Sequence, residues 1–266
     1  MPKYTGRKAV VVGGTTGVGL AIAKRLVEGG ARVLLTGGSA HGFADAERQL
    51  GPAASVIACD LSAADTPNTA GTANASGASD AAAAFASATE NSFGTVDMLF
   101  VGAGPGKPLA EPEAESGTER YDRQFTAAAK GAYLAVQALA PLVADGGAIV
   151  FTTVAADACR PGMPDAGAHA MTASAVHAFA RVLAVELADR GVRVNVVSPG
   201  AIDTPVGVRG PRHGAAPLLG RRGSVDEVAR AALFLAADAT FTTGTVLTVD
   251  GGLGADGGRL CPAPRA

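Results

Sequence analysis

The sequence lacks the cysteine pattern that marks metal-binding and disulfide-rich proteins. Its 266 residues include three cysteines, Cys59, Cys159 and Cys261, which are far apart and do not have the spacing of metal ligands. We therefore expect neither a disulfide framework nor a metal site. Such usage is typical of a reducing compartment, so we expect a cytoplasmic protein.

Basic stripes and long apolar runs are lacking as well. The formal net charge is −2, and no cluster of Lys and Arg is present, which argues against nucleic acid as a partner. The longest apolar runs have the length of strands, and Met1–Val12 has no charged segment followed by an apolar core. We expect neither a membrane span nor a signal peptide.

Short apolar runs of strand length recur along the chain. They are Lys8–Val12, Val33–Leu35, Val56–Ala58, Val96–Val101, Ala148–Thr152, Val192–Val197 and Thr245–Val249. Helical patterns lie between them, and this alternation indicates a parallel sheet with helices on both faces. We predict a doubly wound α/β fold of seven strands in a single domain, because 266 residues suffice for one such core.

Two segments interrupt this alternation. Ser62–Ser79 is rich in small and polar residues and has no periodicity, so it is interpreted as a low-complexity surface insertion. The domain is expected to span residues 1–254, and residues 255–266 to form a C-terminal coil. Ser224 and Glu227 have the spacing of a helix capping box.

A glycine-rich loop follows the first strand. Gly13, Gly17 and Gly19 let the backbone turn sharply and approach a pyrophosphate, at a helix N-terminus that offers free N–H groups. Tight turns between strand and helix also use glycine, but the position directly after a strand favours nucleotide binding. A second glycine cluster, Gly104–Lys107, is followed by Pro108 and lacks the spacing of a P-loop.

With segments further along, this loop resembles the short-chain dehydrogenase/reductase family. The matching segments are Gly13–Gly19, with Val12 where Thr is usual, Asp60-Leu61, Asn195–Thr204, Val225–Ala236, Thr243-Gly244 and Val249–Gly252. The resemblance covers nearly the whole chain. It implies a Rossmann-type fold, a nicotinamide cofactor, a small-molecule substrate, and homodimers or homotetramers built through the long helices.

The resemblance also implies which residues hold the cofactor. Asp60 would contact the adenine, and Thr204 would bind the carboxamide of the nicotinamide. The positions that match the family's cofactor site are Gly13, Thr15, Gly17, Val18, Gly19, Asp60, Leu61, Ala103, Gly104, Pro199, Gly200, Ile202 and Thr204.

The choice of cofactor depends on the end of the second strand. NAD-using relatives carry an acid where this chain has Gly37, and the basic positions of NADP-using relatives are Gly38 and Thr16 here. Because no acid repels a 2′-phosphate, the sequence favours NADP over NAD, with no cofactor as a further alternative. Ser39 and His41 are candidate phosphate contacts, or else ordinary loop residues.

The four catalytic groups of the family are replaced. The family uses a Tyr, a Lys four residues later, a Ser, and an Asn on the preceding helix. The register of the C-terminal motifs places His169 at the Tyr position, Ala173 at the Lys position and Ala128 at the Asn position. The Ser position falls on Val154, or on Thr153 if the loop differs by one residue.

His169 is the main catalytic candidate. Imidazole titrates near neutrality and can act as a general acid or base without a Lys, and Thr153 or Thr152 could supply a hydroxyl. The alternative for His169 is a residue at a helix start bonded to solvent or backbone. His177, eight residues later, is expected in a core or inter-subunit position.

Two loops are expected to enclose the substrate. Pro205–Arg222 corresponds to the family's substrate lid, and the segment before His169 to the wall of its pocket. Their candidate contact residues are Arg209, Arg212 and His213 in the lid, and Asp157, Cys159 and Asp165 in the wall.

Two functional hypotheses follow. The first is a divergent enzyme that binds NADP(H) and acts on a small carbonyl or alcohol metabolite in biosynthesis, with His169 as proton donor; a variant of it is a dehydratase, cyclase or isomerase that uses His169. The second is a non-catalytic nucleotide-binding or scaffold pseudoenzyme, which could form a hetero-oligomer with an active homologue. The retained loop lengths favour the enzyme.

Overall fold

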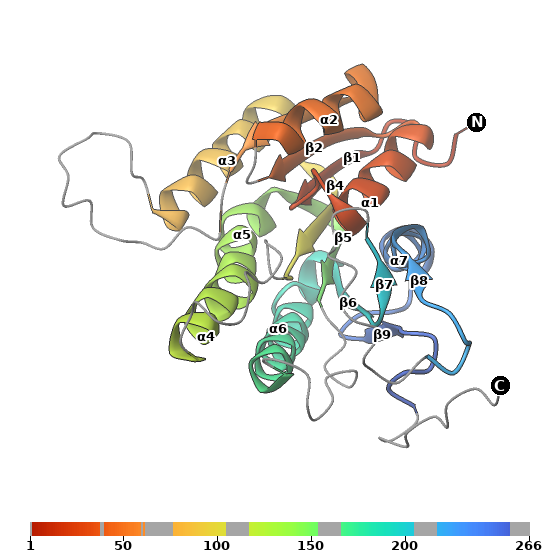
Figure 1. Cartoon of the computed structure of the whole chain (residues 1–266). Helices are drawn as coiled ribbons and strands as arrows, with labels where there is room; N and C mark the ends of the chain where they lie inside the picture. Colours follow the sequence, from red (N-terminus) through yellow and green to blue (C-terminus); the bar gives the residue numbers. More distant parts are fainter. Residues whose placement is uncertain are drawn as a thin grey trace.

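A parallel sheet in the order β3-β2-β1-β4-β5-β6-β9 forms the centre of the molecule (Figure 1). The computed structural model describes residues 2–37, 40–59, 61, 77–104, 117–153, 166–204 and 217–255. The strands are β1 (Lys8–Val12), β2 (Arg32–Gly37), β3 (Ala54–Ala58), β4 (Val96–Gly102), β5 (Val143–Thr152), β6 (Arg193–Pro199) and β9 (Val246–Val249). Each contains one of the seven predicted apolar runs or most of it, and all pair in parallel. The predicted doubly wound, Rossmann-type sheet is therefore confirmed.

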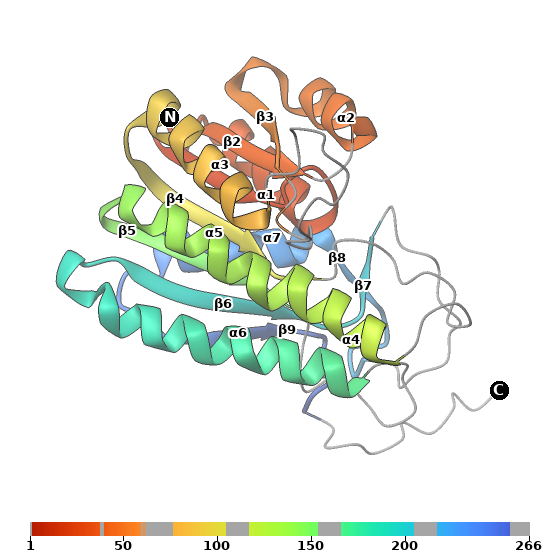
Figure 2. The same cartoon turned by 90° about the vertical axis from the view of Figure 1, so that its left-hand side faces the viewer.

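Helices cover both faces of this sheet (Figures 1 and 2). They are α1 (Gly17–Glu28), α2 (Ala40–Leu50), α3 (Ala78–Phe93), α4 (Gly117–Phe125), α5 (Gly131–Leu139), α6 (Ala166–Glu186) and α7 (Val225–Leu233), with short 3-10 turns η1 (Gly51–Ala53), η3 (Ala140–Leu142) and η5 (Ala188–Arg190). Within the described ranges, no helix combines the length and apolar character needed to span a membrane.

The sheet separates two hydrophobic cores. One core lies under α3, α5 and α6 and contains Leu99 and Phe151; the other lies under α1, α2 and α7 and contains Phe100 and Val150. Adjacent strand residues thus enter opposite cores, because side chains alternate across a strand. This alternation decides which side chains at the ends of the strands can face α6.

The segments that interrupt the alternation are described only in part. Residues 62–76 lie outside the described ranges, and Ala78 and Ser79 already belong to α3, so the helix begins inside the predicted insertion. Of the predicted lid, residues 217–222 are described, and of the predicted C-terminal coil, Ala255. A second sheet, β7 (Ile202–Asp203) with β8 (Gly223–Ser224), joins the two ends of the lid and was not predicted.

A π-helical turn, η2 (Thr126–Lys130), joins α4 to α5 in one continuous helix (Figure 2). The backbone of Phe125 before it and Gly131 after it is helical. Ala128, at the predicted Asn position, is buried in this turn. A π-helical turn accommodates one residue more than an α-helical turn, so it changes which side chains of α4 face the neighbouring helix. A second π-helical turn, η6 (Phe234–Asp238), follows α7.

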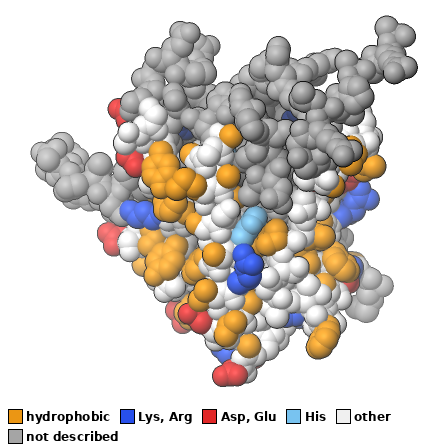
Figure 3. Space-filling view, turned by 90° about the horizontal axis from the view of Figure 1, so that it is seen from below, with side chains coloured by type: hydrophobic (Ala, Val, Ile, Leu, Met, Phe, Trp, Pro, Cys, Tyr) orange, Lys and Arg blue, Asp and Glu red, His pale blue; other side chains and the backbone are white. Residues whose placement is uncertain are grey.

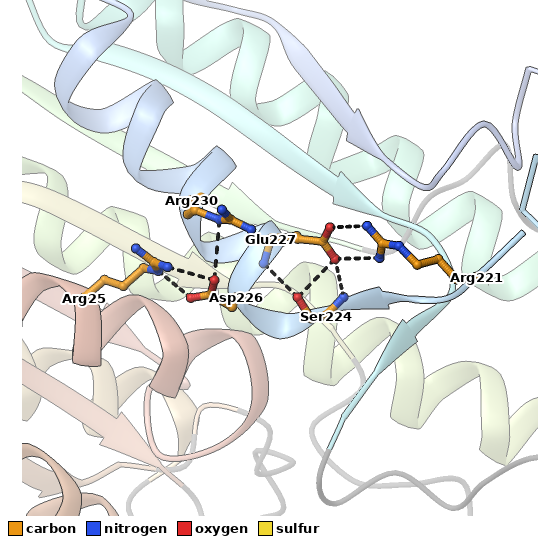
Figure 4. A network of polar contacts seen from close by, with 6 residues as sticks. All are labelled: Arg25, Arg221, Ser224, Asp226, Glu227 and Arg230. Atoms are coloured by element: carbon orange, nitrogen blue, oxygen red, sulfur yellow. Dashed lines mark hydrogen bonds and ion pairs between the residues drawn. The ribbon is translucent and has the colours of Figure 1, made fainter. Parts of the chain in front are cut away.

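An ion-pair network anchors the end of the lid to α7 and α1 (Figure 4). The predicted capping box is confirmed: Ser224 N donates to Glu227 Oε2 at 2.8 Å, and Glu227 N donates to Ser224 Oγ at 3.2 Å. Arg221 donates twice to Glu227, and these bonds lower the pKa of Glu227 to about 2. Arg25 of α1 binds Asp226 and lowers the pKa of that carboxyl.

Candidate active site

The carboxyl ends of β1 and β4 form the crevice where open parallel sheets bind ligands. β1 lies between β2 and β4, and the chain crosses from β3 to β4 on the far side of β1. Gly13 follows β1 with a φ of +76°, and a Cβ built on it would lie 4.0 Å from the Cα of Gly102 in β4. Glycine therefore lines both sides of the crevice.

The glycine loop is held in place by β2. Gly13 N donates to Oγ1 of Thr36 at 3.1 Å, and Gly14 N donates to the carbonyl of Thr36 at 2.8 Å. A Cβ on Gly19 would lie 2.3 Å from the carbonyl oxygen of Gly13, so α1 packs directly on the loop backbone. The N-cap residue Thr16 makes no side-chain cap hydrogen bond, and the first turn of α1 has no acid. The helix N-terminus is thus left for an anion, and the loop fits a dinucleotide pyrophosphate.

Thr15 fills the space at the end of β2 where an acidic side chain would begin. A Cβ on Gly37 would lie 2.1 Å from Oγ1 of Thr15, and Thr15 is 6% exposed. The absence of an acid at Gly37 is therefore linked to the packing of Thr15. Ser39 and the side chain of His41 lie outside the described residues.

The other predicted cofactor segments follow the same edge of the sheet. Ala103 N donates to the carbonyl of Thr152 at 2.8 Å, which extends the pairing of β4 and β5 by one residue. Gly200 N donates to the carbonyl of Val249 at 3.1 Å, and a Cβ on Gly200 would lie 2.5 Å from Cβ of Asp250. Gly104 follows β4 and Pro199 ends β6, so both lie beside these bonds.

The remaining candidate cofactor residues lie in several different elements of the fold. Leu61 is buried, and its carbonyl oxygen would lie 3.1 Å from a Cβ on Gly131 of α5. Ile202 begins β7, and Thr204 is exposed at the start of the lid. Gly17 and Val18 open α1. Asp60 lies outside the described residues.

His169 pairs with a side chain of another helix. It is the fourth residue of α6 and is half-buried, and its Nδ1 lies 2.5 Å from Nε2 of Gln124 on α4. Gln124 is only 4% exposed. The structure therefore gives His169 a side-chain partner, which neither expectation for this residue included. Gln124 was not predicted, since no motif marks it; its place four residues before Ala128 was the available signal.

The predicted Lys and Asn positions carry no polar group. Ala173 and Ala128 are both buried. The described part of α6 therefore offers no cation one turn after His169. Among the described residues, no group of three His, Cys, Asp or Glu is arranged to hold a metal ion.

Thr153 has an imidazole partner of its own. Its Oγ1 lies 3.1 Å from Nε2 of His177, and Thr153 is 4% exposed. His177 lies eight residues beyond His169, which is about 12 Å along a helix that rises 1.5 Å per residue. His177 is half-buried and bonded to a buried residue, and its position relative to a neighbouring subunit stays a prediction. His169 and Thr153 have separate partners in the structure.

Thr152 lies on the opposite side of the sheet from α6. Phe151 enters the core under α5 and α6, and Val150 enters the core under α1 and α7. Side chains two apart on a strand share a face, so Thr152 follows Val150. The structure does not bring Thr152 to His169.

The other candidates of the pocket and lid lie outside the described residues. They are Val154, Asp157, Cys159, Asp165, Arg209, Arg212 and His213.

The outer side of α5 and α6 carries several exposed apolar side chains. Seen from below, the molecule shows several groups of apolar side chains, with Lys and Arg side chains among them (Figure 3). Tyr133 of α5 packs on Phe179 of α6 with ring centroids 5.4 Å apart, beside a hollow of about 360 Å³ between the helices. Met171, Val182 and Val185 are exposed on α6.

Comparison with known proteins agrees with this geometry. The family model described as Enoyl-(Acyl carrier protein) reductase matches residues 12–254. D-threitol dehydrogenase of Mycolicibacterium smegmatis is 34% identical over 262 residues, which are 94% of this chain and 94% of the relative. The cyclic-di-GMP-binding biofilm dispersal mediator protein of Escherichia coli is 32% identical over 96% of this chain and 100% of its own length.

Solved structures show the same likeness. The crystal structure of BdcA in complex with NADPH superposes with a TM-score of 0.75 at 28% identity, over 94% of this chain and 95% of that chain. The glycine crevice, the strand order and these matches lead to one conclusion. The chain belongs to the short-chain dehydrogenase/reductase family.

Proposed function

We propose that the protein is a reductase or dehydrogenase that binds NADP(H) and acts on a small carbonyl or alcohol metabolite, with His169 at the substrate oxygen. The observation that carries this proposal is the pair of His169 and Gln124, 2.5 Å apart. The pair would hold an imidazole at the position that the resemblance assigns to the family's Tyr. Polar side chains held in fixed positions beside a ligand site are typical of catalytic groups.

The Gly13–Gly19 loop would hold the pyrophosphate of the cofactor, and Ile202 and Thr204 would lie at the nicotinamide. Bound NADPH supplies a hydride to a carbonyl carbon, and NADP⁺ accepts one from an alcohol. The packing of Thr15 on Gly37 leaves no acid to repel a 2′-phosphate, which supports NADP over NAD. The NADPH in the BdcA structure supports the same preference.

D-threitol dehydrogenase, one of the relatives, supports a small polyol or the matching carbonyl compound as the substrate class. The apolar side of α5 and α6 supports assembly into a homodimer or homotetramer, or pairing with an active homologue. A non-redox dehydration, cyclisation or isomerisation at His169 would use the same crevice.

The second candidate function is nucleotide binding without turnover. The buried alanines at the predicted Lys and Asn positions favour it, because they remove two groups of the family's proton relay. The relative named as a cyclic-di-GMP-binding mediator supports it as well. Such a protein would bind the nucleotide in the glycine crevice and leave its substrate cleft unused.

The test is a calorimetric titration with NADPH and NADH, followed by a panel of carbonyl and alcohol compounds. We expect NADPH to bind more tightly than NADH, and His169→Ala to abolish turnover while NADPH still binds. Met171→Ala, an exposed neighbour on α6, serves as the control and should retain turnover. Binding without turnover on any compound would support the second function, and no binding of either nicotinamide nucleotide would refute the first.

A further inference from the structure

One arginine side chain joins the two ends of the predicted lid. Nε of Arg222 donates to Oδ1 of Asp203 at 2.6 Å, and Nη2 of the same guanidinium donates to the carbonyl of Ile202 at 2.8 Å. The planar guanidinium thus binds a carboxylate and a backbone carbonyl at once, through two of its five N–H donors. A side chain at one end of the lid therefore holds both residues of β7 at the other end.

The backbone pairing at this place is short. β7 and β8 pair in parallel over two residues each, and Gly223 N donates to the carbonyl of Ala201 at 2.9 Å. Even a two-stranded hairpin is only marginally stable in water, and parallel pairing is slightly weaker per residue. A Cβ on Gly223 would lie 2.7 Å from Cδ1 of Ile202, so the side chain of Ile202 packs directly on the backbone of β8. We therefore expect this pairing to depend on the two bonds from Arg222.

β8 is the fixed side of this contact. It leads directly into α7, whose first turn carries the capping box of Ser224 and Glu227. In the same turn Asp226 binds Arg25 of α1 (Figure 4). β7, in contrast, continues the chain from the end of β6, past the carboxyl edge of the sheet where ligands bind. Arg222 therefore ties a segment at the ligand edge to a helix whose start is anchored.

We infer that Arg222 is a positioning residue that holds residues 202–204 ready for the nicotinamide half of the cofactor. This inference rests on the proposed function, which places the nicotinamide at Ile202 and Thr204. It also deepens that function, because a segment that is already ordered lowers the entropy cost of binding. Arg222 would thus raise the affinity for the nicotinamide and leave the contribution of the pyrophosphate, at the glycine loop, unchanged.

The expected effect is modest because the ion pair is exposed. The side chains of Arg222 and Asp203 are 56% and 74% exposed, and exposed ion pairs contribute little stability. Loss of this pair together with the carbonyl bond should shift the pairing of β7 and β8 toward the open form by about three- to tenfold. The affinity falls only with the share of the closed form that is lost, so we expect about two- to fivefold weaker binding of NADPH.

The test uses three variants. Arg222→Met removes both bonds and keeps an unbranched apolar stem. Arg222→Lys keeps a cation that can bind Asp203 but lacks the planar fork of donors. The matched control is Arg48→Met, because Arg48 on α2 is likewise exposed and forms an ion pair with Asp45 of the same helix.

Binding is measured by calorimetry with NADPH and with 2′-phospho-ADP-ribose, which is the same cofactor without its nicotinamide. In Arg222→Met we expect weaker binding of NADPH and unchanged binding of 2′-phospho-ADP-ribose, and Arg222→Lys should restore part of the loss. Arg48→Met should bind both compounds as the unsubstituted protein does. Equal weakening for the two compounds would indicate a merely structural role and overturn the inference, as would unchanged binding of NADPH.

A measurement without ligand separates this inference from the proposed function. Hydrogen exchange of the Gly223 N–H, followed by NMR, reports the opening of its bond to Ala201. We expect exchange about three- to tenfold faster in Arg222→Met, and no change at the N–H of Glu227 in the capping box. Unchanged exchange at Gly223 would overturn the inference. Faster exchange in a protein that binds neither compound would refute the proposed function and support the role of Arg222 in holding the segment.

Discussion

Oγ1 of Thr153 lies 3.1 Å from Nε2 of His177, and this bond joins the end of β5 to the middle of α6. The backbone of Thr153 donates to the carbonyl of Val197 at 3.0 Å, so the same residue also continues the pairing with β6. Since Thr153 is buried, the bond contributes to the position of α6 over the sheet. The height of His169 above the sheet depends on that position.

We expect Thr153→Val and His177→Leu each to destabilise the fold by about 1 kcal/mol, because each removes a hydrogen bond and leaves a polar partner partly buried. The double variant should be destabilised by less than the sum of the two, with a difference of about 1 kcal/mol. Urea denaturation of the four proteins measures this difference. Strict additivity would show that the contact contributes no stability.

Gly19→Ala should disrupt the nucleotide loop. Its Cβ would lie 2.3 Å from the carbonyl oxygen of Gly13, so α1 has to move off the loop. We expect a loss of about 1–3 kcal/mol in stability, as for overpacked cores, and a loss of NADPH binding. Thermal unfolding and calorimetry measure the two effects.

The control for Gly19→Ala is Gly167→Ala in the first turn of α6, where an added Cβ meets no atom within 4 Å. This variant should bind NADPH as before and be more stable by up to about 1 kcal/mol, because Ala favours helix. Equal behaviour of the two variants would contradict the role of the close approach at Gly19.

Gly37→Asp should destabilise the protein, because its Cβ would lie 2.1 Å from Oγ1 of Thr15. Adding Thr15→Gly makes room for the carboxylate, which would bind ribose hydroxyls and repel a 2′-phosphate. We expect the double variant to shift the ratio of NADPH to NADH affinity by about tenfold or more toward NADH, which is about 1.4 kcal/mol. An unchanged ratio in a folded double variant would argue against the ribose end lying at Gly37.

Glu227 should make the fold sensitive to acid. Its bonds to Arg221 and Ser224 lower its pKa from 4.5 to about 2 in the folded protein. A carboxyl with a lowered pKa stabilises the fold above its unfolded pKa, and this contribution is lost as the pH falls from 4.5 toward 2. Glu227→Gln should therefore be less stable than the unsubstituted protein at pH 7, and the difference should shrink at pH 3.

Denaturant midpoints at pH 7, 5 and 3 measure the effect of Glu227→Gln. Glu47→Gln on the exposed side of α2 is the control, and we expect it to follow the unsubstituted protein at each pH. A difference that stays constant from pH 7 to pH 3 would indicate that the capping bonds of the side chain, and not its charge, carry the stabilisation.

The strands and the capping box were predictable because each leaves a local pattern: an apolar run, or Ser and Glu three residues apart. β7 and β8 left none, since each has two residues. The start of α3 at Ala78 was missed because small residues without periodicity resemble a loop.

The candidate site was predictable only where a family motif marks it. Gln124 comes from a helix far from His169 in the sequence, and only the packing of α4 on α6 brings the two together. The bond from Thr153 to His177 likewise depends on the tertiary structure. The separation of Thr152 from α6, in contrast, follows from alternation along β5 and was available from the sequence once Phe151 was assigned to a face.

The π-helical turn changes the rotation of Gln124 relative to Tyr133 about the helix axis, and both of these residues contact α6. Gln124 and Tyr133 are nine residues apart, and in an α-helix nine residues turn through about 900°, which puts them on opposite sides. The extra residue in Thr126–Lys130 removes about 100° of that rotation, so that Gln124 meets His169 while Tyr133 meets Phe179. Deleting one residue from the turn would therefore leave all strands and all candidate site residues in the sequence. It would nevertheless rotate Gln124 away from His169. In this protein, the number of residues in a helix matters for the site as much as their identity.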